Sequence, residues 1–194
     1  MKIAIIGTHG TGKTTLAYRL CSEAKKRGKN AIILNETARS CPFPINEGSS
    51  LDGFLWMTGT QLAKEQLAVA HKSDFIVCDR SVIDHVAYVP LKFANGKIFD
   101  YMSYACIAWL DTYDKIFWVV PTSKAEIVND GIRCTDPEFQ ERIHHRFEDI
   151  LANVPCSTRI REVDSQNIFD DKLDFVIREA FKPIERNESI CLGF

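Results

Sequence analysis

The sequence has no long hydrophobic run, no C-x-x-C pair, no internal repeat and almost no excess of charge. No apolar run approaches the roughly 20 residues that cross a bilayer, so we expect no membrane partner. A formal net charge of −2 provides no general attraction to nucleic acid, which makes a nucleic-acid partner an unfavoured interpretation. The seven cysteines are scattered and odd in number, which argues against a disulfide framework or a zinc site.

The chain length and the first residues predict the number of domains and the cellular compartment. The 194 residues suit one domain with a sizeable core, and we expect a single domain over residues 1–183 followed by a tail at 184–194. Met1-Lys2-Ile3 leads directly into an expected strand without the pattern of a signal peptide. Together with the unpaired pattern of the cysteines, this predicts a cytoplasmic protein. The sequence leaves the oligomeric state open, a homodimer included.

Short apolar runs alternate with segments of helical periodicity, which is typical of a parallel sheet covered on both faces. The expected strands are 2–6, 31–34, 75–78, 116–120 and a weaker one at 159–163. The expected helices are 13–28, 51–71, 81–88, 99–110, 136–152 and 171–181. The pattern predicts a three-layer α/β fold. The connection over residues 35–50 is long for a compact domain, and such loops are often functional.

Residues 7–15, Gly-Thr-His-Gly-Thr-Gly-Lys-Thr-Thr, match the phosphate-binding pattern G-x-x-x-x-G-K-[ST] between an expected strand and an expected helix. Glycines permit backbone conformations and a closeness to the ligand that a Cβ would block. The loop amides then form a concave anion site at the positive end of the helix. Lys13 supplies a cation for the β- and γ-phosphates, and the hydroxyl of Thr14 is a ligand for Mg²⁺. His9 fills a variable position and is expected to face solvent or nucleotide. The expected nucleotide-binding residues are Gly7, His9, Gly10, Thr11, Gly12, Lys13, Thr14 and Thr15.

Acidic residues follow two of the expected strands, at the sheet edge where ligands of open α/β sheets bind. Asp79 comes after four apolar residues, the context of a metal-holding acid, with helix capping as the alternative. Glu36 could take the proton of an acceptor hydroxyl as general base, or could be a solvent-exposed loop carboxylate. Arg80 could steady a phosphate or the acceptor, or could form a surface ion pair worth little.

A second basic region lies between the fourth strand and the following helix. Arg133, next to the hinge residue Gly131, could swing onto the phosphates and neutralise developing charge, as part of a small lid around residues 130–146. Arg142 and Arg146 flank two histidines on the next helix, and for His144 and His145 we favour a solvated face. Two further groups of residues each allow two interpretations. Gln61 and Gln66 could hydrogen-bond a base or lie at the surface, and Phe54, Trp56 and Tyr88 could stack on a ring or belong to the core.

Together these motifs resemble the AAA-like P-loop ATPase and kinase group that includes the ribosylnicotinamide kinase domain of NadR. The residues that carry the likeness are Gly7–Thr14, Glu36, Asp79-Arg80-Ser81-Val82-Ile83-Asp84 and Asp130-Gly131-Ile132-Arg133. The first three also resemble deoxynucleoside kinases, which usually have Glu-Pro where this chain has Glu36-Thr37 and commonly Glu where it has Asp79. The resemblance implies strand order 2-3-1-4-5 and ATP rather than GTP as the nucleotide. It also implies Glu36 as base or metal partner, Asp79 as the magnesium acid and Arg133 as a lid arginine.

The leading hypothesis is a small-molecule kinase. ATP and Mg²⁺ would occupy residues 7–15, the acceptor would lie near Glu36 and Arg80, and the lid would exclude water. Nucleosides, nucleotides and ribosyl-pyridines are the expected acceptors. One alternative is an NTPase that acts as a nucleotide-dependent switch, with loop 35–50 facing a protein partner. Another is a nucleic-acid end kinase, which the near-neutral charge disfavours.

Overall fold

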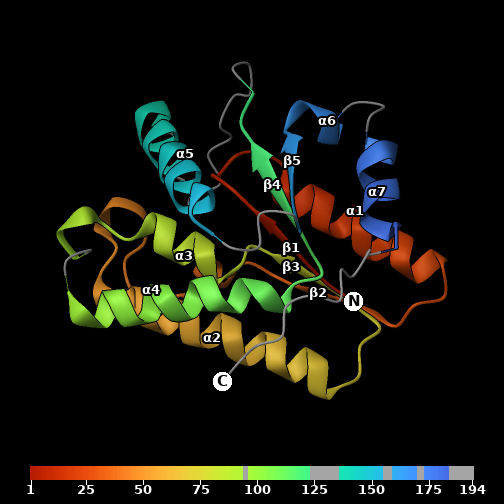
Figure 1. The fold of residues 1–194 in the computed structure, drawn as a ribbon, viewed down its shortest axis with the longest axis horizontal. Coiled ribbons are helices and arrows are strands. Elements are labelled where there is room, and N and C mark those ends of the chain that lie inside the picture. Colours follow the sequence, from red (N-terminus) through yellow and green to blue (C-terminus); the bar gives the residue numbers. More distant parts are fainter. Residues whose placement is uncertain (94–95, 123–135, 155–158, 170–172, 184–194) are drawn as a thin grey trace.

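The computed structural model describes residues 1–93, 96–122, 136–154, 159–169 and 173–183, and these form a three-layer α/β fold (Figure 1). Five parallel strands make one sheet in the order β2-β3-β1-β4-β5, which confirms the predicted fold class and strand order. The strands are β1 (Lys2–Ile6), β2 (Ala31–Leu34), β3 (Phe75–Asp79), β4 (Lys115–Val120) and β5 (Ile160–Asp164).

The helices fall close to the predicted ranges. They are α1 (Lys13–Lys26), α2 (Leu51–Ala70), α3 (Val82–Tyr88), α4 (Lys97–Trp109), α5 (Pro137–Ala152), α6 (Gln166–Phe169) and α7 (Leu173–Phe181). The prediction missed α6, because a single turn of four residues carries no helical periodicity. It also began α4 two residues late, since Lys97 and Ile98 precede the first clearly periodic apolar residue. None of the described helices combines the length and the apolar character that a bilayer crossing requires.

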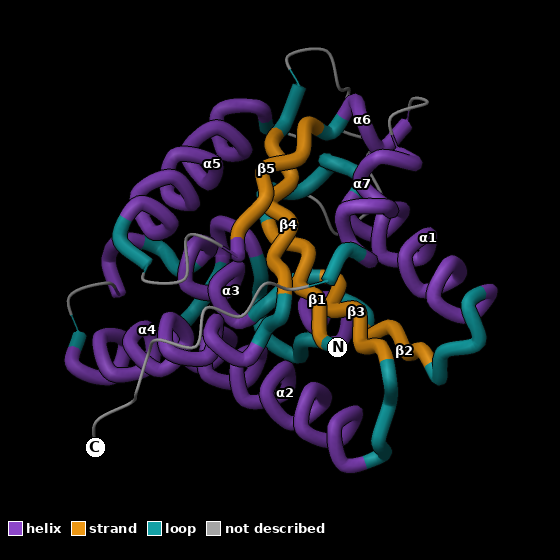
Figure 2. The backbone as a smooth tube through the Cα atoms, turned by 45° about the vertical axis from the view of Figure 1, so that its right-hand side comes forward, coloured by secondary structure: helices purple, strands orange, loops and turns teal. Residues whose placement is uncertain are grey.

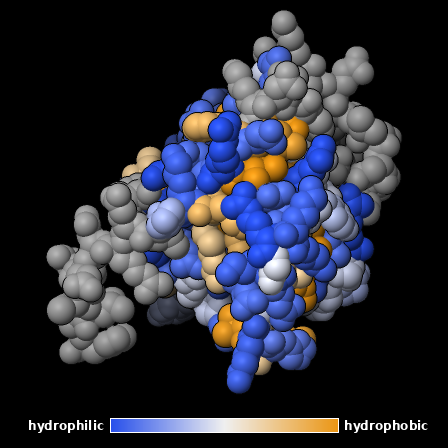
Figure 3. Space-filling view, turned by 90° about the vertical axis from the view of Figure 1, so that its right-hand side faces the viewer, coloured by the Kyte–Doolittle hydropathy of each residue, from blue (hydrophilic) through white to orange (hydrophobic). Residues whose placement is uncertain are grey.

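The two faces of the sheet bury two separate clusters. Because alternate side chains of a strand point to opposite faces, Ile3 and Ile5 of β1 pack with α1 and α7, whereas Ala4 and Ile6 pack with the helices of the other layer. Figures 1 and 2 show α1, α6 and α7 on one side of the sheet and α2 to α5 on the other. The outer surface over α1 and α7 is mostly hydrophilic, with small hydrophobic patches (Figure 3). Both faces of the sheet are therefore covered, as a parallel sheet requires.

All five strands are parallel, so their carboxyl ends lie at one edge of the sheet. The loop after β1 leads into α1, and the loops after β2 and β3 begin at Asn35 and Arg80. Since β3 pairs with both β1 and β2, these three loops are neighbours. The residues expected to carry chemistry are thereby brought together at this edge.

Candidate functional site

The loop between β1 and α1 has the backbone that its glycines predict. Gly7, Gly10 and Gly12 have φ values of +129°, +76° and +83°, which side-chain-bearing residues rarely adopt. A Cβ on Gly7 would also lie 2.3 Å from the carbonyl oxygen of Val119 in β4. Gly12 is the N-cap of α1, so the loop ends at the positive end of that helix.

A small polar cavity, called here the loop cavity, opens beside these residues, with about 220 Å³ of empty space including its mouth. Its lining residues are Gly10, Thr11, Gly12, Lys13, Thr14, Glu36, Asp79 and Arg80. Of the residues predicted to bind nucleotide, Gly7 and Thr15 do not line the loop cavity: Gly7 lies against β4 and Thr15 is exposed on α1. The other predicted residues, Gly10 to Thr14, line the loop cavity, whereas His9 does not.

Lys13 lies folded into the loop cavity. Its side chain is buried, and Nζ donates hydrogen bonds to the carbonyl oxygen of Thr8 and to Thr11 Oγ1, the latter at 3.2 Å. Burial, followed by the nearby charge of Arg80, lowers the pKa of Lys13 to about 7. A bound anion would therefore stabilise the charged form of Lys13 and raise its pKa.

Thr14 and Asp79 lie side by side across the loop cavity. Thr14 Oγ1 donates a hydrogen bond of 2.7 Å to Asp79 Oδ2, which joins the first turn of α1 to the last residue of β3. Burial raises the pKa of Asp79 above its ordinary value, although the bond from Thr14 and the charge of Arg80 oppose this. The described residues bring no three metal-binding side chains together. A hydroxyl and a single carboxylate suit Mg²⁺, which usually takes one or two protein ligands and completes its shell with phosphates and water.

Arg80 is buried and contacts three acceptors. Its Nε donates to Glu36 Oε1, and its Nη1 donates to Asp84 Oδ1 at 3.2 Å and to the carbonyl oxygen of Gly7 at 3.3 Å. Its φ of +80° places a non-glycine residue in the left-handed region, at a cost of about 1–2 kcal/mol. The surface ion pair considered as an alternative for Arg80 is therefore wrong, because the guanidinium belongs to the interior of the site.

Glu36 lies largely covered against Arg80, so a solvent-exposed loop position is wrong for this residue as well. Its side chain is 11% exposed, and Arg39 Nε lies 3.4 Å from its second oxygen. Burial alone would raise the pKa of Glu36, but Arg80, Lys13 and Arg39 outweigh burial and hold the pKa below its ordinary value. Glu36 is accordingly a carboxylate at neutral pH.

A second, wider cavity adjoins the first, with about 490 Å³ of empty space including its open mouth. This wide cavity is lined by His9, Glu36, Ala38, Ile45, Asn46, Ser49, Met57, Arg80, Asp84, His85 and Tyr88. Glu36 and Arg80 line both cavities, so the two meet at this ion pair. The sequence signals for the wide cavity were the long loop 35–50 and the candidate acceptor residues Glu36, Arg80 and Tyr88. Its other walls come from α2, from α3 and from the loops before α1 and after β3.

The structure corrects the expectation that His9 faces solvent, whereas contact with a nucleotide remains a prediction. Only 2% of its surface is exposed, and its ring lies in the wall of the wide cavity and not of the loop cavity. Its Nδ1 is 2.9 Å from the hydroxyl of Tyr88, which also accepts a 2.9 Å bond from the His9 backbone N–H. The ring stacks on Phe139 of α5 with centroids 5.7 Å apart.

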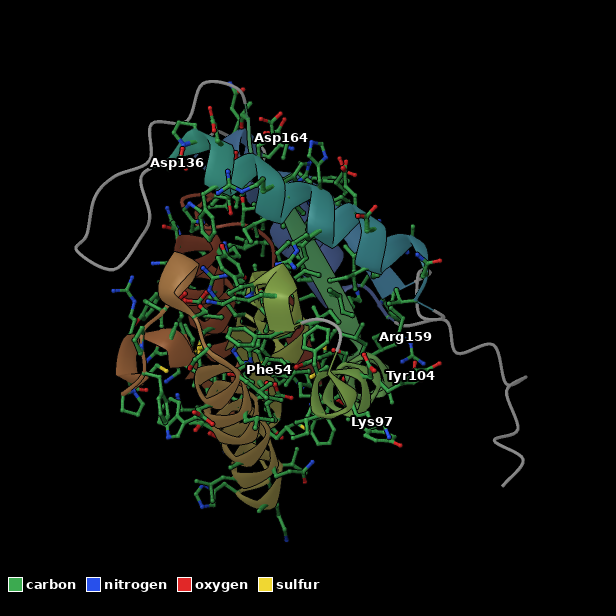
Figure 4. The ribbon with its side chains drawn as sticks, turned by 90° about the vertical axis from the view of Figure 1, so that its left-hand side faces the viewer. Phe54, Lys97, Tyr104, Asp136, Arg159 and Asp164 are labelled. Carbon is green, nitrogen blue, oxygen red and sulfur yellow. The ribbon has the colours of Figure 1, made fainter. Side chains whose placement is uncertain are left out.

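Arg133 and the hinge at Gly131 lie outside the described residues, so only α5 of the expected lid can be placed. Asp136 caps the start of α5, at the end of the helix labelled in Figure 4, by accepting from Glu138 N at 3.0 Å and Phe139 N at 3.3 Å. Gln140 Nε2 donates a 2.7 Å bond to the carbonyl oxygen of His9. This bond ties α5 to the loop between β1 and α1, called here the phosphate-type loop.

The basic residues of α5 do not converge on the loop cavity. Arg146 Nη1 donates to the carbonyl oxygens of Ala87, at 2.9 Å, and Val89, and so ties α5 to the end of α3. His145 is 63% exposed, as the solvated interpretation predicts. The solvated interpretation is wrong for His144, whose side chain is only 20% exposed and whose ring stacks on Trp118 of β4 with centroids 5.5 Å apart.

The structure decides between the alternatives left open for the glutamines and for two of the aromatic residues. Phe54 is a core residue with 1% of its surface exposed, whereas Tyr88 lines the wide cavity. Gln66 is exposed on α2, but Gln61 is completely buried and lines neither cavity. A surface position and a bond to a base are therefore both wrong for Gln61.

Comparison with known proteins gives one family and a consistent fold. The sequence matches the AAA domain family over residues 2–167. Among solved structures, deoxyadenosine kinase from M. mycoides with the products dCMP and a flexible dCDP bound has a TM-score of 0.63 at 18% identity, covering 93% of this chain and 98% of that one. The same kinase with bound dATP has a TM-score of 0.58 at 18% identity, with coverages of 94% and 100%. Curated protein sequences give no significant match.

Proposed function

The chain belongs to the AAA domain family, and from that membership and the two joined cavities we propose that it is a kinase that transfers the γ-phosphoryl group of ATP to a hydroxyl of a nucleoside-like acceptor. The observation that carries the proposal is the position of Glu36 and Arg80, which border both cavities. A group-transfer enzyme needs two adjoining sites with its reacting groups at their boundary. A phosphate site alone would serve an NTPase equally well.

On the donor side, the triphosphate would lie in the loop cavity. Amides of the loop and the N-terminus of α1 would bind phosphate oxygens, and the Lys13 ammonium would lie against the β- and γ-phosphates. Thr14 and Asp79, whose oxygens are 2.7 Å apart, would hold Mg²⁺. A bound Mg²⁺ supplies positive charge that neutralises the phosphate oxygens and orients them for transfer.

On the acceptor side, Glu36 would accept the proton of the attacking hydroxyl. Its lowered pKa keeps it ionised at neutral pH, and its place between the cavities puts it within reach of a hydroxyl at their junction. Arg80 would neutralise charge on the transferring group. Because phosphoryl transfer needs little covalent help, this positioning and charge neutralisation would supply most of the acceleration.

The charge of the wide cavity favours an uncharged acceptor over a monophosphate. Among its described lining residues the one permanent cation is Arg80, which Glu36 and Asp84 already match. Burial lowers the pKa of His85 to about 3, so this histidine is neutral. Apolar walls from Ile45, Met57 and the Tyr88 ring suit a flat ring. The structurally similar M. mycoides protein is a deoxyadenosine kinase with dCMP as a bound product, which supports a nucleoside-like acceptor.

The test is an acceptor screen with ATP and Mg²⁺. Ribonucleosides, deoxynucleosides and ribosyl-pyridines are incubated with the protein beside their monophosphates, and products are separated by charge. We expect transfer to at least one nucleoside-type hydroxyl and none to a monophosphate. If ATP binds well but no candidate is phosphorylated, the kinase proposal fails. Hydrolysis without acceptor that a protein partner stimulates would instead favour the switch NTPase.

A further inference from the structure

Gln61 contacts the hydroxyl of the residue after Glu36 and the backbone of Arg80, and so reaches both members of the Glu36–Arg80 pair. Its Oε1 accepts a 2.8 Å hydrogen bond from the hydroxyl of Thr37, the residue directly after Glu36. Its Nε2 lies 3.5 Å from the carbonyl oxygen of Arg80. One side chain in the middle of α2 thus tethers both residues that border the two cavities, without lining either cavity itself.

Glu65, one turn further along α2, fixes the orientation of the Gln61 amide. Glu65 is completely buried and accepts a 2.9 Å bond from Gln61 Nε2. Its other donors, all 2.6–2.8 Å away, are Lys2 Nζ, Trp109 Nε1 and the Tyr113 hydroxyl. Glu65 accepts from every one of these donors, so Gln61 presents its NH₂ group to Glu65 and its oxygen to Thr37.

The burial of this network makes its geometry specific. Thr37 is 1% exposed and Gln61 is fully buried, so neither can exchange its partner for water. The Thr37 hydroxyl also accepts from Lys64 Nζ at 3.5 Å, but without Gln61 its own hydrogen has no acceptor, which favours the arrangement in which every group is paired. The chain of bonds runs from Glu65 in the core through Gln61 to Thr37 and ends beside Glu36.

We propose that Gln61 and Thr37 are positioning residues that hold the carboxylate of Glu36 against Arg80 at the junction of the cavities. The catalytic part of this inference rests on the proposed function, in which Glu36 accepts the proton of the acceptor. The structural part concerns only the Glu36–Arg80 contact. A displacement of about 1 Å at such a group can lower a rate by up to a hundredfold.

The experiment compares Thr37→Val, which keeps the shape of the side chain but removes the hydroxyl, with Thr37→Ser, which keeps the hydroxyl. With an acceptor found in the screen, we expect Thr37→Val to lower kcat by roughly tenfold to a hundredfold, with KM for ATP within about twofold of wild type. Thr37→Ser should restore most of kcat. Gln61→Met is a second variant with the same expected loss, and Gln66→Met on the exposed face of α2 is its control. Equal kcat values for Thr37→Val and wild type overturn the inference.

A double-mutant cycle separates positioning from a general loss of structure. In a Glu36→Gln background, Thr37→Val should have almost no further effect, because the group that it positions is already gone. A loss of kcat of the same factor in both backgrounds would show a role independent of Glu36 and would overturn the inference. Thermal unfolding of each variant confirms that folded proteins are compared.

A second measurement does not depend on any acceptor. The hydrogen bond from Arg80 Nε to Glu36 protects the Arg80 Nε proton from exchange with water, and NMR can follow that exchange. We expect at least fivefold faster exchange in Thr37→Val and in Gln61→Met than in wild type, Thr37→Ser and Gln66→Met. If no acceptor is phosphorylated but exchange follows this pattern, the kinase proposal fails and the positioning network stands. If exchange is the same in all variants, the positioning role is refuted whether or not the protein is a kinase.

Discussion

The loop cavity and the wide cavity share Glu36 and Arg80, yet they are built in different ways. Most of the loop cavity comes from five consecutive residues, Gly10 to Thr14, in the loop after β1 and the first turn of α1. The wide cavity collects side chains from that loop, from residues 36–49, from α2 and from α3. Its walls include Ile45, Met57 and the Tyr88 ring, whereas the loop cavity is almost entirely polar.

This difference separates two tasks that a group-transfer enzyme must perform. Backbone amides bind any triphosphate, so the loop cavity can keep its function while side chains elsewhere change. Side chains that come from several elements decide which second molecule fits. Substitutions in one cavity should therefore change one substrate's kinetics and leave the other's nearly unaltered, except at the shared ion pair.

The largest loss of activity is expected at Glu36, because this residue lines both cavities and its substitution cannot affect one substrate alone. Glu36→Gln removes the proposed base, and kcat should fall by roughly 10²- to 10⁴-fold. Steady-state kinetics with the identified acceptor measure kcat, and ATP titration measures nucleotide affinity, which should change far less. Glu141→Gln on the exposed face of α5 is the control. A loss confined to ATP affinity would assign Glu36 to the loop cavity alone.

The next largest effect should be confined to the loop cavity. Lys13→Ala removes the buried ammonium that faces the phosphates, and turnover should fall by roughly 10²- to 10³-fold together with nucleotide affinity. The KM for the acceptor should stay close to that of wild type. Lys29→Ala, at an exposed position after α1, is the matched control. Unchanged nucleotide affinity in Lys13→Ala would remove the basis of the whole functional proposal.

The same contrast explains how much the sequence could predict. The phosphate-type loop and the strands were predictable because each depends on consecutive residues, and the strand order followed from the resemblance. The direction of the His9 side chain was not, because it depends on Tyr88 and Phe139, far along the chain. The burial of Gln61 was missed for the same reason. Its partners are polar residues of the loop after β2 (Thr37) and of α2 (Glu65), where a polar side chain by itself suggests a surface position.

Glu36 and Arg80 illustrate the limit of the prediction most directly. Both were chosen correctly as strand-end residues, but the sequence could not decide between a functional position and a solvent-exposed one. Their low exposure and their mutual bond rule out the solvent-exposed alternative, while the functional roles of both residues remain predictions. Interpretations of this kind depend on which loops become neighbours, and the pairing of β3 with β2 determines that here. Arg133 lies outside the described residues, so its proposed role remains a prediction.

An intermediate effect should appear in the pH dependence of nucleotide binding. Burial and Arg80 lower the pKa of Lys13 to about 7 in the free protein. Below pH 7 the lysine is already charged, whereas above pH 7 binding of a polyanion must take up a proton, so affinity should fall by up to about tenfold per pH unit. Calorimetry at pH 8 in two buffers of different ionisation enthalpy measures this uptake. Lys13→Met should take up no proton, and equal uptake in both proteins would contradict the assignment to Lys13.

The smallest effect tests how sharply the two cavities are separated. Tyr88 lines the wide cavity, but its hydroxyl accepts a bond from the backbone of His9 in the phosphate-type loop. Tyr88→Phe leaves that buried N–H without its acceptor, which should lower the free energy of unfolding by about 1–3 kcal/mol. We expect KM for the acceptor to rise severalfold, because the ring and His9 form one wall.

In the same variant, KM for ATP should change by less than about twofold, because the amides of Gly10 to Lys13 lie beyond His9 and belong to the loop cavity. Tyr104→Phe, whose side chain is 78% exposed on α4 (Figure 4), is the control for loss of a tyrosine hydroxyl. An equal rise of both KM values would mean that the His9 backbone transmits changes from one cavity to the other. The two cavities would then form a single unit, and acceptor specificity could not change without a cost in ATP binding.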